Sequence, residues 1–174
     1  MTLLENDFIR LEPLAIEHAH ALSQWIDNTD TWTWWVREPP ITLEKLKASI
    51  EAALIVGKER EPFVIYSKKI DTFIGETSFW YREAGKIEIG STWISHTVRS
   101  TGFNRQVKRL MIDHALNSLN YPHVILQTDV LNIRCRKAIE NIGGVLIKRI
   151  ENHVKVWDGR MRHTVVYSVN EVPE

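Results

Sequence analysis

The stretch KIEIGSTWISHTVRSTGFNRQVKRLMIDHALNSL, residues 86–119, decides the fold. Its first part, residues 86–95, is rich in β-branched and aromatic residues and predicts a strand. Its last part has apolar residues at helical spacing and predicts a helix over residues 102–119: Phe103, Val107, Leu110, Met111, Ala115, Leu116 and Leu119. The turn between them contains Gly102 and leads into the helix, so its backbone amides outline an anion site.

The segments on either side of this stretch predict further strands and helices of a mixed α/β domain. Strands are expected at residues 8–11, 63–67, 72–80, 124–129, 145–150 and 163–169. Helices are expected at residues 17–27, 42–56 and 132–142. A helix joins the strands at 86–95 and 124–129, so these two should be parallel, while the others pair mostly antiparallel. We therefore expect one domain, residues 1–174, whose six- to seven-stranded sheet has helices on both faces.

Composition excludes several classes of protein. Lys and Arg together number 22, as do Asp and Glu, so no global charge points to nucleic acid or membrane as the main partner. The single cysteine, Cys135, excludes an internal disulfide and a thiolate-rich metal site, and the seven histidines are scattered. We therefore expect no metal. No apolar run has the length of a membrane span or follows a signal-peptide pattern, which predicts a cytoplasmic protein.

A polar segment, residues 28–40, holds three tryptophans, Trp32, Trp34 and Trp35. No regular element is predicted there to bury them. They either plug the end of a core or form an apolar wall for a ligand.

Four motifs occur along the chain in a fixed order. They are Ile87-Glu88-Ile89-Gly90, then Arg99-Ser-Thr-Gly102-Phe-Asn104, then Asn132-x-Arg134-x-x-x-Ala138 before Gly143-Gly144, and finally Asp158-Gly159 leading into Thr164-Val165-Val166-Tyr167. Through these motifs, nearly the whole chain resembles the GCN5-related N-acetyltransferase (GNAT) superfamily, and within it the RimJ/RimL-like branch.

The resemblance implies transfer of an acetyl group from acetyl-CoA to a primary amine, by direct attack on the thioester. A protein N-terminal α-amine is slightly preferred, and a small amine or a polyamine is possible. The alternative is a catalytically silent CoA-binding regulatory or interaction module with the same fold. Among similar proteins homodimers are frequent, so a homodimer is possible here.

The resemblance also assigns residues to CoA. In the family, the backbone of the glycine loop holds the pyrophosphate, which here means Arg99, Ser100, Thr101, Gly102, Phe103 and Asn104. The central parallel strands splay apart, and the pantetheine arm pairs with the edge formed here by Trp93, Ile94 and Ser95. Asn132 matches an asparagine that contacts the pantetheine, and it also suits a helix N-cap. Arg105, Lys108 and Arg109 either add charge near the phosphates or form a solvated basic face.

Two further residues are candidates for the chemistry. Glu88 matches the position of a general base. Strand alternation predicts that its side chain lies on the same face as Gly90, Thr92 and Ile94. Alternatively, Glu88 is a salt-bridged or solvent-facing strand residue. Cys135 replaces the serine of an N-x-x-S pattern. It is a small buried hydrophobe, a proton donor or contact for the CoA sulfur, or a covalent acyl carrier.

The acceptor amine should enter between the tryptophan segment and the strand turn near residues 79–81. The expected acceptor pocket therefore contains Trp32, Trp34, Trp35 and Trp80.

Overall fold

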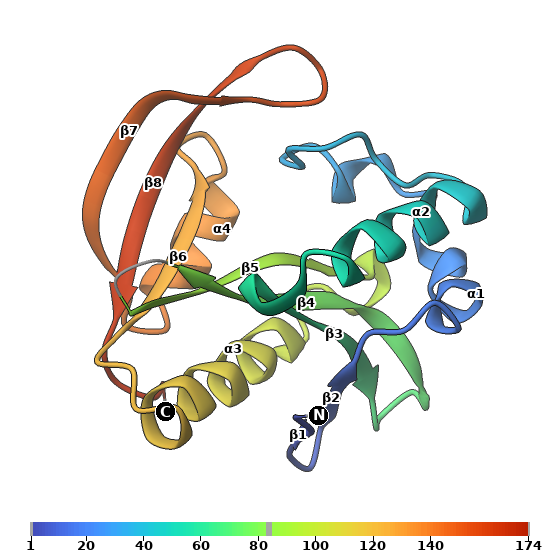
Figure 1. Cartoon of the computed structure of the whole chain (residues 1–174), viewed down its shortest axis with the longest axis horizontal. Helices are drawn as coiled ribbons and strands as arrows, with labels where there is room; N and C mark the ends of the chain where they lie inside the picture. Colours follow the sequence, from blue (N-terminus) through green and yellow to red (C-terminus); the bar gives the residue numbers. More distant parts are fainter. Residues whose placement is uncertain (1, 83–84, 174) are drawn as a thin grey trace.

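A single mixed sheet of eight strands forms the centre of the protein, in a computed structural model that describes residues 2–82 and 85–173. The strands are β1 (Leu4–Glu5), β2 (Ile9–Pro13), β3 (Arg60–Ser67), β4 (Thr72–Arg82), β5 (Lys86–Ile94), β6 (Val124–Asp129), β7 (Val145–Lys155) and β8 (Met161–Val169). Their order across the sheet is β1-β2-β3-β4-β5-β6-β8-β7 (Figure 1). Within the described residues only β5 and β6 are parallel. The mixed, mostly antiparallel prediction is confirmed.

The prediction of six to seven strands is wrong by one strand, β1. This strand has two residues and pairs with β2 through Leu4 and Glu5. A two-residue strand is too short to produce an alternating pattern, so the sequence carries no periodic signal for it.

In the described part of the chain, four α-helices flank the sheet: α1 (His18–Leu22), α2 (Leu43–Leu54), α3 (Phe103–Asp113) and α4 (Ile133–Glu140). The Thr42 side chain accepts a hydrogen bond from the Lys45 amide and caps α2. The helix predicted over residues 102–119 ends its α-helical part at Asp113 and continues as a π-helical turn, His114–Ser118. The helix predicted over residues 17–27 is shorter, because a 3₁₀ turn follows it at Ser23–Trp25.

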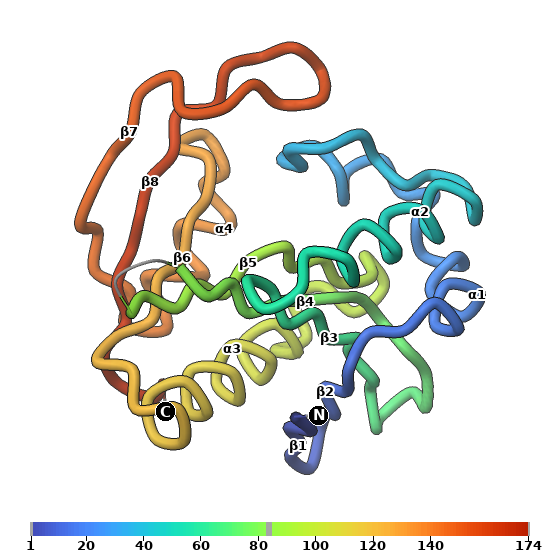
Figure 2. Tube along the Cα trace, in the orientation of Figure 1, coloured from blue at the N-terminus to red at the C-terminus, as the bar shows by residue number. Residues whose placement is uncertain are grey.

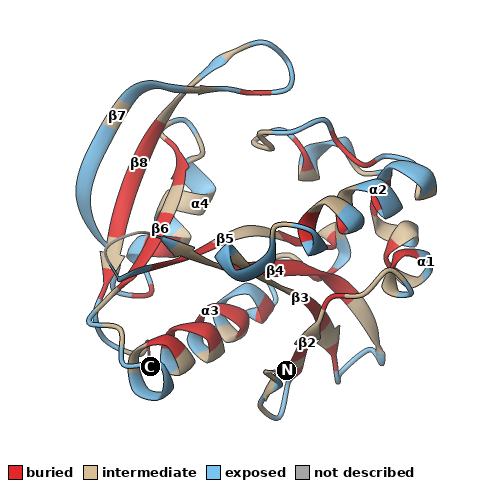
Figure 3. Ribbon diagram, viewed as in Figure 1, coloured by how far each residue is buried: buried red, intermediate tan, exposed pale blue. Residues whose placement is uncertain are grey.

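Two hydrophobic cores lie on opposite faces of the sheet (Figure 3). On one face, α3 and α4 cover a core that includes Ile87, Ile89, Val107, Met111 and Ile139. On the other face, α1, α2 and the tryptophan segment cover a core that includes Leu22, Leu46, Ile50, Trp32 and Trp93. Helices on both faces are thus confirmed.

A β-bulge in β5 changes which side chains share a face. Glu76 of β4 pairs with Trp93, while Ser78 pairs with Gly90, so β5 carries one extra residue between these pairs. Ser91 has a positive φ of 49° at this point. A bulge shifts the alternation by one residue.

The bulge makes the predicted face of Glu88 wrong in part. Glu88 and Gly90 lie on the α2 face, which Trp93 also joins, whereas Thr92 and Ile94 contact the α3 side. A residue distant in sequence allows β4 to lie close to β5 just after the bulge: a Cβ on Gly75 would lie 2.0 Å from the Trp93 carbonyl oxygen, so only glycine fits there.

The parallel pair β5 and β6 forms a fork. Their pairing is confined to Ile87 with Val124 and Glu88 with Ile125. Beyond Glu88, β5 runs on to Ile94 without a paired neighbour on this side, in the part of the chain that the structure describes. The expected splay of the central parallel strands is therefore confirmed.

The β7–β8 hairpin extends beyond the sheet and arches toward the tryptophan segment (Figure 2). At its tip, the Trp157 indole N–H donates to the Trp32 carbonyl oxygen at 3.3 Å. This contact bridges the region above the fork.

None of the helices within residues 2–82 and 85–173 is both long and apolar enough to span a membrane.

Candidate active site

Glu88 lies at the point of the fork, on the last residue of β5 that pairs with β6. Its side chain is 10% exposed. One carboxylate oxygen, Oε2, accepts hydrogen bonds from Arg82 Nε at 3.0 Å, Arg82 Nη2 at 2.8 Å and Gln127 Nε2 at 3.1 Å. The alternative of a salt-bridged residue is therefore correct, because two N–H groups of Arg82 donate to the same carboxylate oxygen.

The other oxygen of Glu88, Oε1, lies beside Gly90. A Cβ on Gly90 would lie 3.2 Å from this oxygen and 3.3 Å from Trp80 Cδ1. Two guanidinium groups pack on the Trp80 ring, with Arg60 4.8 Å and Arg82 4.9 Å from its ring centroid. Glycine at position 90 thus keeps space free next to an acid whose surroundings are held rigidly.

Lys108 reaches the fork from the α3 side of the sheet. The residue is 8% exposed, and its ammonium donates to Thr92 Oγ1 at 2.8 Å. Burial lowers its pKa to about 8, and the nearby Cys135 and Glu88 act in the opposite direction. Burial makes the solvated basic face wrong for Lys108, whereas a contribution of its charge near the phosphates stays a prediction. Arg105 and Arg109 are exposed.

Cys135 lies on the first turn of α4. Its amide donates to the Asn132 side-chain oxygen at 3.1 Å, which confirms Asn132 as the N-cap of α4. The thiol is free and half-buried. These positions place the first turn of α4 on the β6 side of the fork.

The glycine turn has the backbone of an anion nest. Ser100 and Gly102 have φ angles of 62° and 89°, and a Cβ on Gly102 would meet no atom within 4 Å. Phe103 is buried at 6% exposure and fixes the start of α3, so it can offer only its backbone to a ligand. Asn104 is exposed and lies within regular α3. Its replacement of glycine therefore needs no unusual backbone angle.

Positive charge gathers at the mouth of this turn. Arg99 donates to Thr31 Oγ1 at 2.5 Å, which ties the turn to the tryptophan segment. Burial lowers the pKa of Arg99, and the nearby guanidinium of Arg134 lowers it further. A cavity of about 370 Å³ lies here, lined by Asp30, Thr33, Trp34, Leu131, Asn132, Ile133 and Arg134. Two cations and a nest of amides suit phosphate.

The residues expected along the pantetheine edge are mostly buried by their side chains. Trp93 is 4% exposed and Ser95 is fully buried, while Ile94 packs on the α3-side core. Because β5 has no β6 partner beyond Glu88 in the described chain, the backbone on this side of the strand is what faces the gap.

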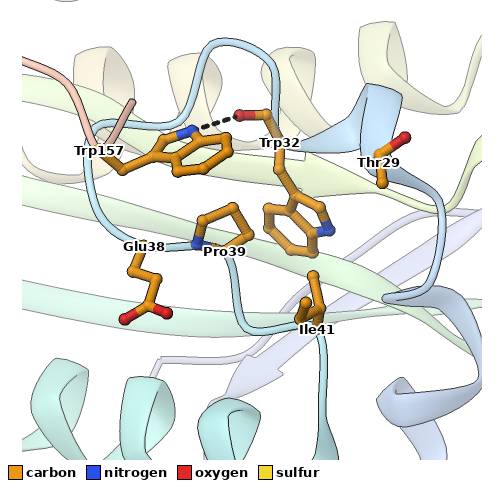
Figure 4. Close-up of a pocket in the computed structure, with 6 residues that line it drawn as sticks. All are labelled: Thr29, Trp32, Glu38, Pro39, Ile41 and Trp157. Atoms are coloured by element: carbon orange, nitrogen blue, oxygen red, sulfur yellow. Dashed lines mark hydrogen bonds between the residues drawn. The ribbon is translucent and has the colours of Figure 1, made fainter. Parts of the chain in front are cut away.

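The four expected acceptor tryptophans do not line one pocket. Trp32 is 1% exposed, packs on Trp93 at 5.4 Å between ring centroids, and borders a cavity of about 440 Å³. Trp35 packs on Trp32, Trp34 borders the cavity at α4, and Trp80 lies beside Glu88. The cavity at Trp32 is lined by Thr29, Trp32, Glu38, Pro39, Ile41 and Trp157 (Figure 4).

Sequence reasoning missed several groups at the fork, because they come from strands distant in sequence. Gln127 of β6 and Arg82 of β4 hold Glu88, and Trp157 closes the aromatic cavity from the hairpin tip. Arg162 of β8 has a buried Nε without a hydrogen-bond partner in the described chain. Burial lowers the pKa of Arg162, and the nearby Asp129, Glu88 and Cys135 act in the opposite direction.

Comparisons with known proteins agree with this architecture. A family model described as an acetyltransferase (GNAT) domain matches residues 9–145. A protein from T. thermophilus taken to be an acetyltransferase has 28% identity and a TM-score of 0.87, with 98% of this chain and 89% of that one covered. No curated protein matches the sequence.

Two more distant structures share the fold. A GCN5-related N-acetyltransferase from Brucella melitensis has 23% identity and a TM-score of 0.89, covering 97% of this chain and 78% of its own. A ribosomal-protein-S5-alanine acetyltransferase from Vibrio fischeri has 15% identity and a TM-score of 0.79, and both chains are covered completely. At these identities the likeness extends to the fold alone.

Proposed function

Because this chain belongs to the family of GNAT acetyltransferase domains, we propose that it moves an acetyl group from acetyl-CoA to a primary amine. Members of this family are acyltransferases that use acetyl-CoA. The observation that carries the proposal is the fork between β5 and β6, with the buried Glu88 carboxylate at its point. We also propose that the chain belongs to the RimJ/RimL-like branch of the superfamily.

The chain has features that fit both ends of acetyl-CoA. The amides around Ser100 and Gly102, together with Arg99 and Arg134, would hold the pyrophosphate. The side of β5 that has no β6 partner, at Trp93 and Ile94, together with Ser95 just beyond the strand, would pair with the amides of the pantetheine arm, while Asn132 keeps its capping role. Acetyl-CoA supplies an activated carbonyl carbon as a thioester.

Glu88 would act on the incoming amine. An amine attacks only when it is neutral, so a carboxylate that takes its proton, directly or through a water molecule, speeds the reaction. The Oε1 oxygen next to Gly90 has the room for this contact, whereas Oε2 is occupied by Arg82 and Gln127. Arg82 is a positioning residue, because it holds Glu88 and touches no substrate itself.

An N-terminal α-amine is the favoured acceptor. Its pKa is about 7.7 to 8.0, against about 10.4 for a lysine side chain, so a much larger fraction is neutral at physiological pH. The aromatic cavity between Trp32 and Trp157 would take an apolar side chain near the amine. A small amine or a polyamine is the second candidate.

The rival proposal is a CoA-binding module without catalysis. Release of free thiol from acetyl-CoA, measured with a panel of N-terminal peptides, polyamines and small amines, separates the two. We expect one amine class to raise release above hydrolysis, and Glu88→Gln to lower kcat/KM by at least ~10²-fold while CoA still raises the melting temperature. If CoA raises the melting temperature and no amine raises thiol release, the module is the correct function.

A further inference from the structure

Lys108 interrupts the apolar face of α3. Its neighbours on the inward side of the helix, Val107, Met111 and Ile112, are fully buried, and Lys108 is buried with them at 8% exposure. Placing a charged side chain there is costly unless it has a partner or a function. An ammonium has three N–H donors, and Thr92 is its one hydrogen-bond partner in the part of the chain that the structure describes.

The ammonium contacts β5 on the α3 side of the sheet, close enough to Glu88 and Cys135 to interact with both electrostatically. Thr92 lies in the part of β5 that pairs with β4 but has no β6 partner in the described chain, so the bond from Lys108 to Thr92 Oγ1 holds the charge near the gap between β5 and β6. Two groups act on the ammonium electrostatically, Cys135 of α4 and Glu88 of β5, and both raise its pKa. Arg162 of β8 interacts with the same acid and thiol.

We propose that the Lys108 ammonium faces the sulfur of CoA in the fork, stabilises the departing thiolate and gives it a proton. The inference rests on the proposed function, because it requires acetyl-CoA to lie along the free edge of β5. A cation next to a thiol favours the thiolate, as lysine does beside reactive cysteines. With a pKa of about 8, close to that of a thiol at about 8.5, Lys108 holds its proton at neutral pH and gives it up readily.

The proton transfers balance across the fork. The acceptor nitrogen forms a bond to the carbonyl carbon, the carbon–sulfur bond breaks, and its electron pair leaves with the sulfur. Lys108 passes one proton to this sulfur. The nitrogen, already neutral when it attacks, loses one further proton to become an amide; Glu88 takes this proton after passing to solvent the one it removed from the incoming amine. Exchange with solvent returns a proton to Lys108 and removes one from Glu88.

The test measures the pKa of the CoA thiol while CoA is bound. Cys135 is the only cysteine of the chain, so in a Cys135→Ala background the CoA thiol is the only thiol in the complex. Ultraviolet absorbance of the thiolate is followed from neutral to alkaline pH. We expect the bound thiol to titrate about one pKa unit below its free value of about 8.5, and Lys108→Met to abolish this shift.

Binding supplies an independent readout. Near pH 8, where Lys108 still holds its proton in part and the thiolate forms, Lys108→Met should weaken CoA binding about twofold and leave acetyl-CoA binding unchanged, since acetyl-CoA has no thiolate. Unchanged acetyl-CoA binding also shows that the variant folds. Lys108→Arg, which keeps a cation, should retain most of the shift, and Lys69→Met, which removes an exposed charge in the β3–β4 turn, should retain all of it.

The possible results separate the two proposals. If the bound thiol has the same pKa with and without the Lys108→Met substitution, and CoA binds to both proteins, the role of Lys108 is overturned and the acetyltransferase proposal stands. If neither CoA nor acetyl-CoA binds the unsubstituted protein, the proposed function itself fails.

Discussion

Replacing Glu76 of β4 by glutamine should change how the stability of the protein depends on pH. Glu76 is 5% exposed, and its Oε1 is buried without a hydrogen-bond partner in the described chain. Burial raises its pKa from 4.5 to about 7, although Trp93 and Arg60 act in the opposite direction. The folded protein therefore holds this proton more tightly than the unfolded chain does.

The size of the effect follows from the two pKa values. A raised acid pKa gives a contribution to stability that is fully present below about pH 4.5 and is lost as the pH rises to about 7. At about 1.36 kcal/mol per pKa unit, the full loss is about 3 kcal/mol. Glutamine carries no titrating proton, so the stability of Glu76→Gln relative to the unsubstituted protein should increase across this range.

Urea unfolding at a series of pH values from about 5 to 8.5 measures this difference. We expect the free energy of unfolding of Glu76→Gln, minus that of the unsubstituted protein, to grow by about 2 to 3 kcal/mol across the series. Glu51→Gln, on the exposed side of α2, is the matched control and should show no such growth. A difference for Glu76→Gln that stays constant with pH would refute the reasoning, because a constant offset requires equal proton binding in both states.

Three other substitutions test separate parts of the structure. Lys108→Met should stabilise the protein by up to about 3 kcal/mol at pH 7. The lowered pKa of Lys108, about 8, means that burying the ammonium destabilises the folded protein below pH 8, and this destabilisation disappears toward pH 10.5. Equal urea midpoints of the two proteins at pH 7 would contradict this. Gly102→Ala should lower the free energy of unfolding by about 1 kcal/mol, because φ is 89° at this position. It should also weaken CoA binding in calorimetry, and unchanged binding would exclude the glycine turn as the phosphate site. Trp157→Ala should raise the KM for a peptide acceptor and leave that for acetyl-CoA unchanged; the reverse pattern would remove the aromatic cavity from the acceptor path.

Local patterns were sufficient for most of the secondary structure and for the glycine turn. The β5–α3 connection was predictable because alternation, a glycine at positive φ and helical spacing all act over a few residues. The N-cap role of Asn132 was predictable for the same reason, since the side chain bonds an amide three residues away.

The orientation of side chains at the fork was less predictable. The face shared by Glu88 depends on a bulge whose partner strand passes closely only because Gly75 has no Cβ. Three tryptophans in one segment, together with Trp80, suggested one pocket. In the fold, Trp32 and Trp35 belong to a core, Trp32 and Trp34 border two different cavities, and Trp80 lies in the sheet. Contacts such as Arg82 with Glu88 are set by strand register, which no single stretch of sequence specifies.

The sequence by itself determined that residues 86–119 form a strand, a glycine turn and a helix, because each of these depends on neighbours within one or two turns of chain. It also carried the glycine-turn motif, which lies within residues 9–145 that the family model matches. Only the tertiary structure decided that Lys108 points inward to Thr92, that Glu88 lies at the end of the paired part of β5, and that Trp157 closes a cavity with Trp32. These relations join residues from different strands and helices, and packing of the whole sheet fixes them.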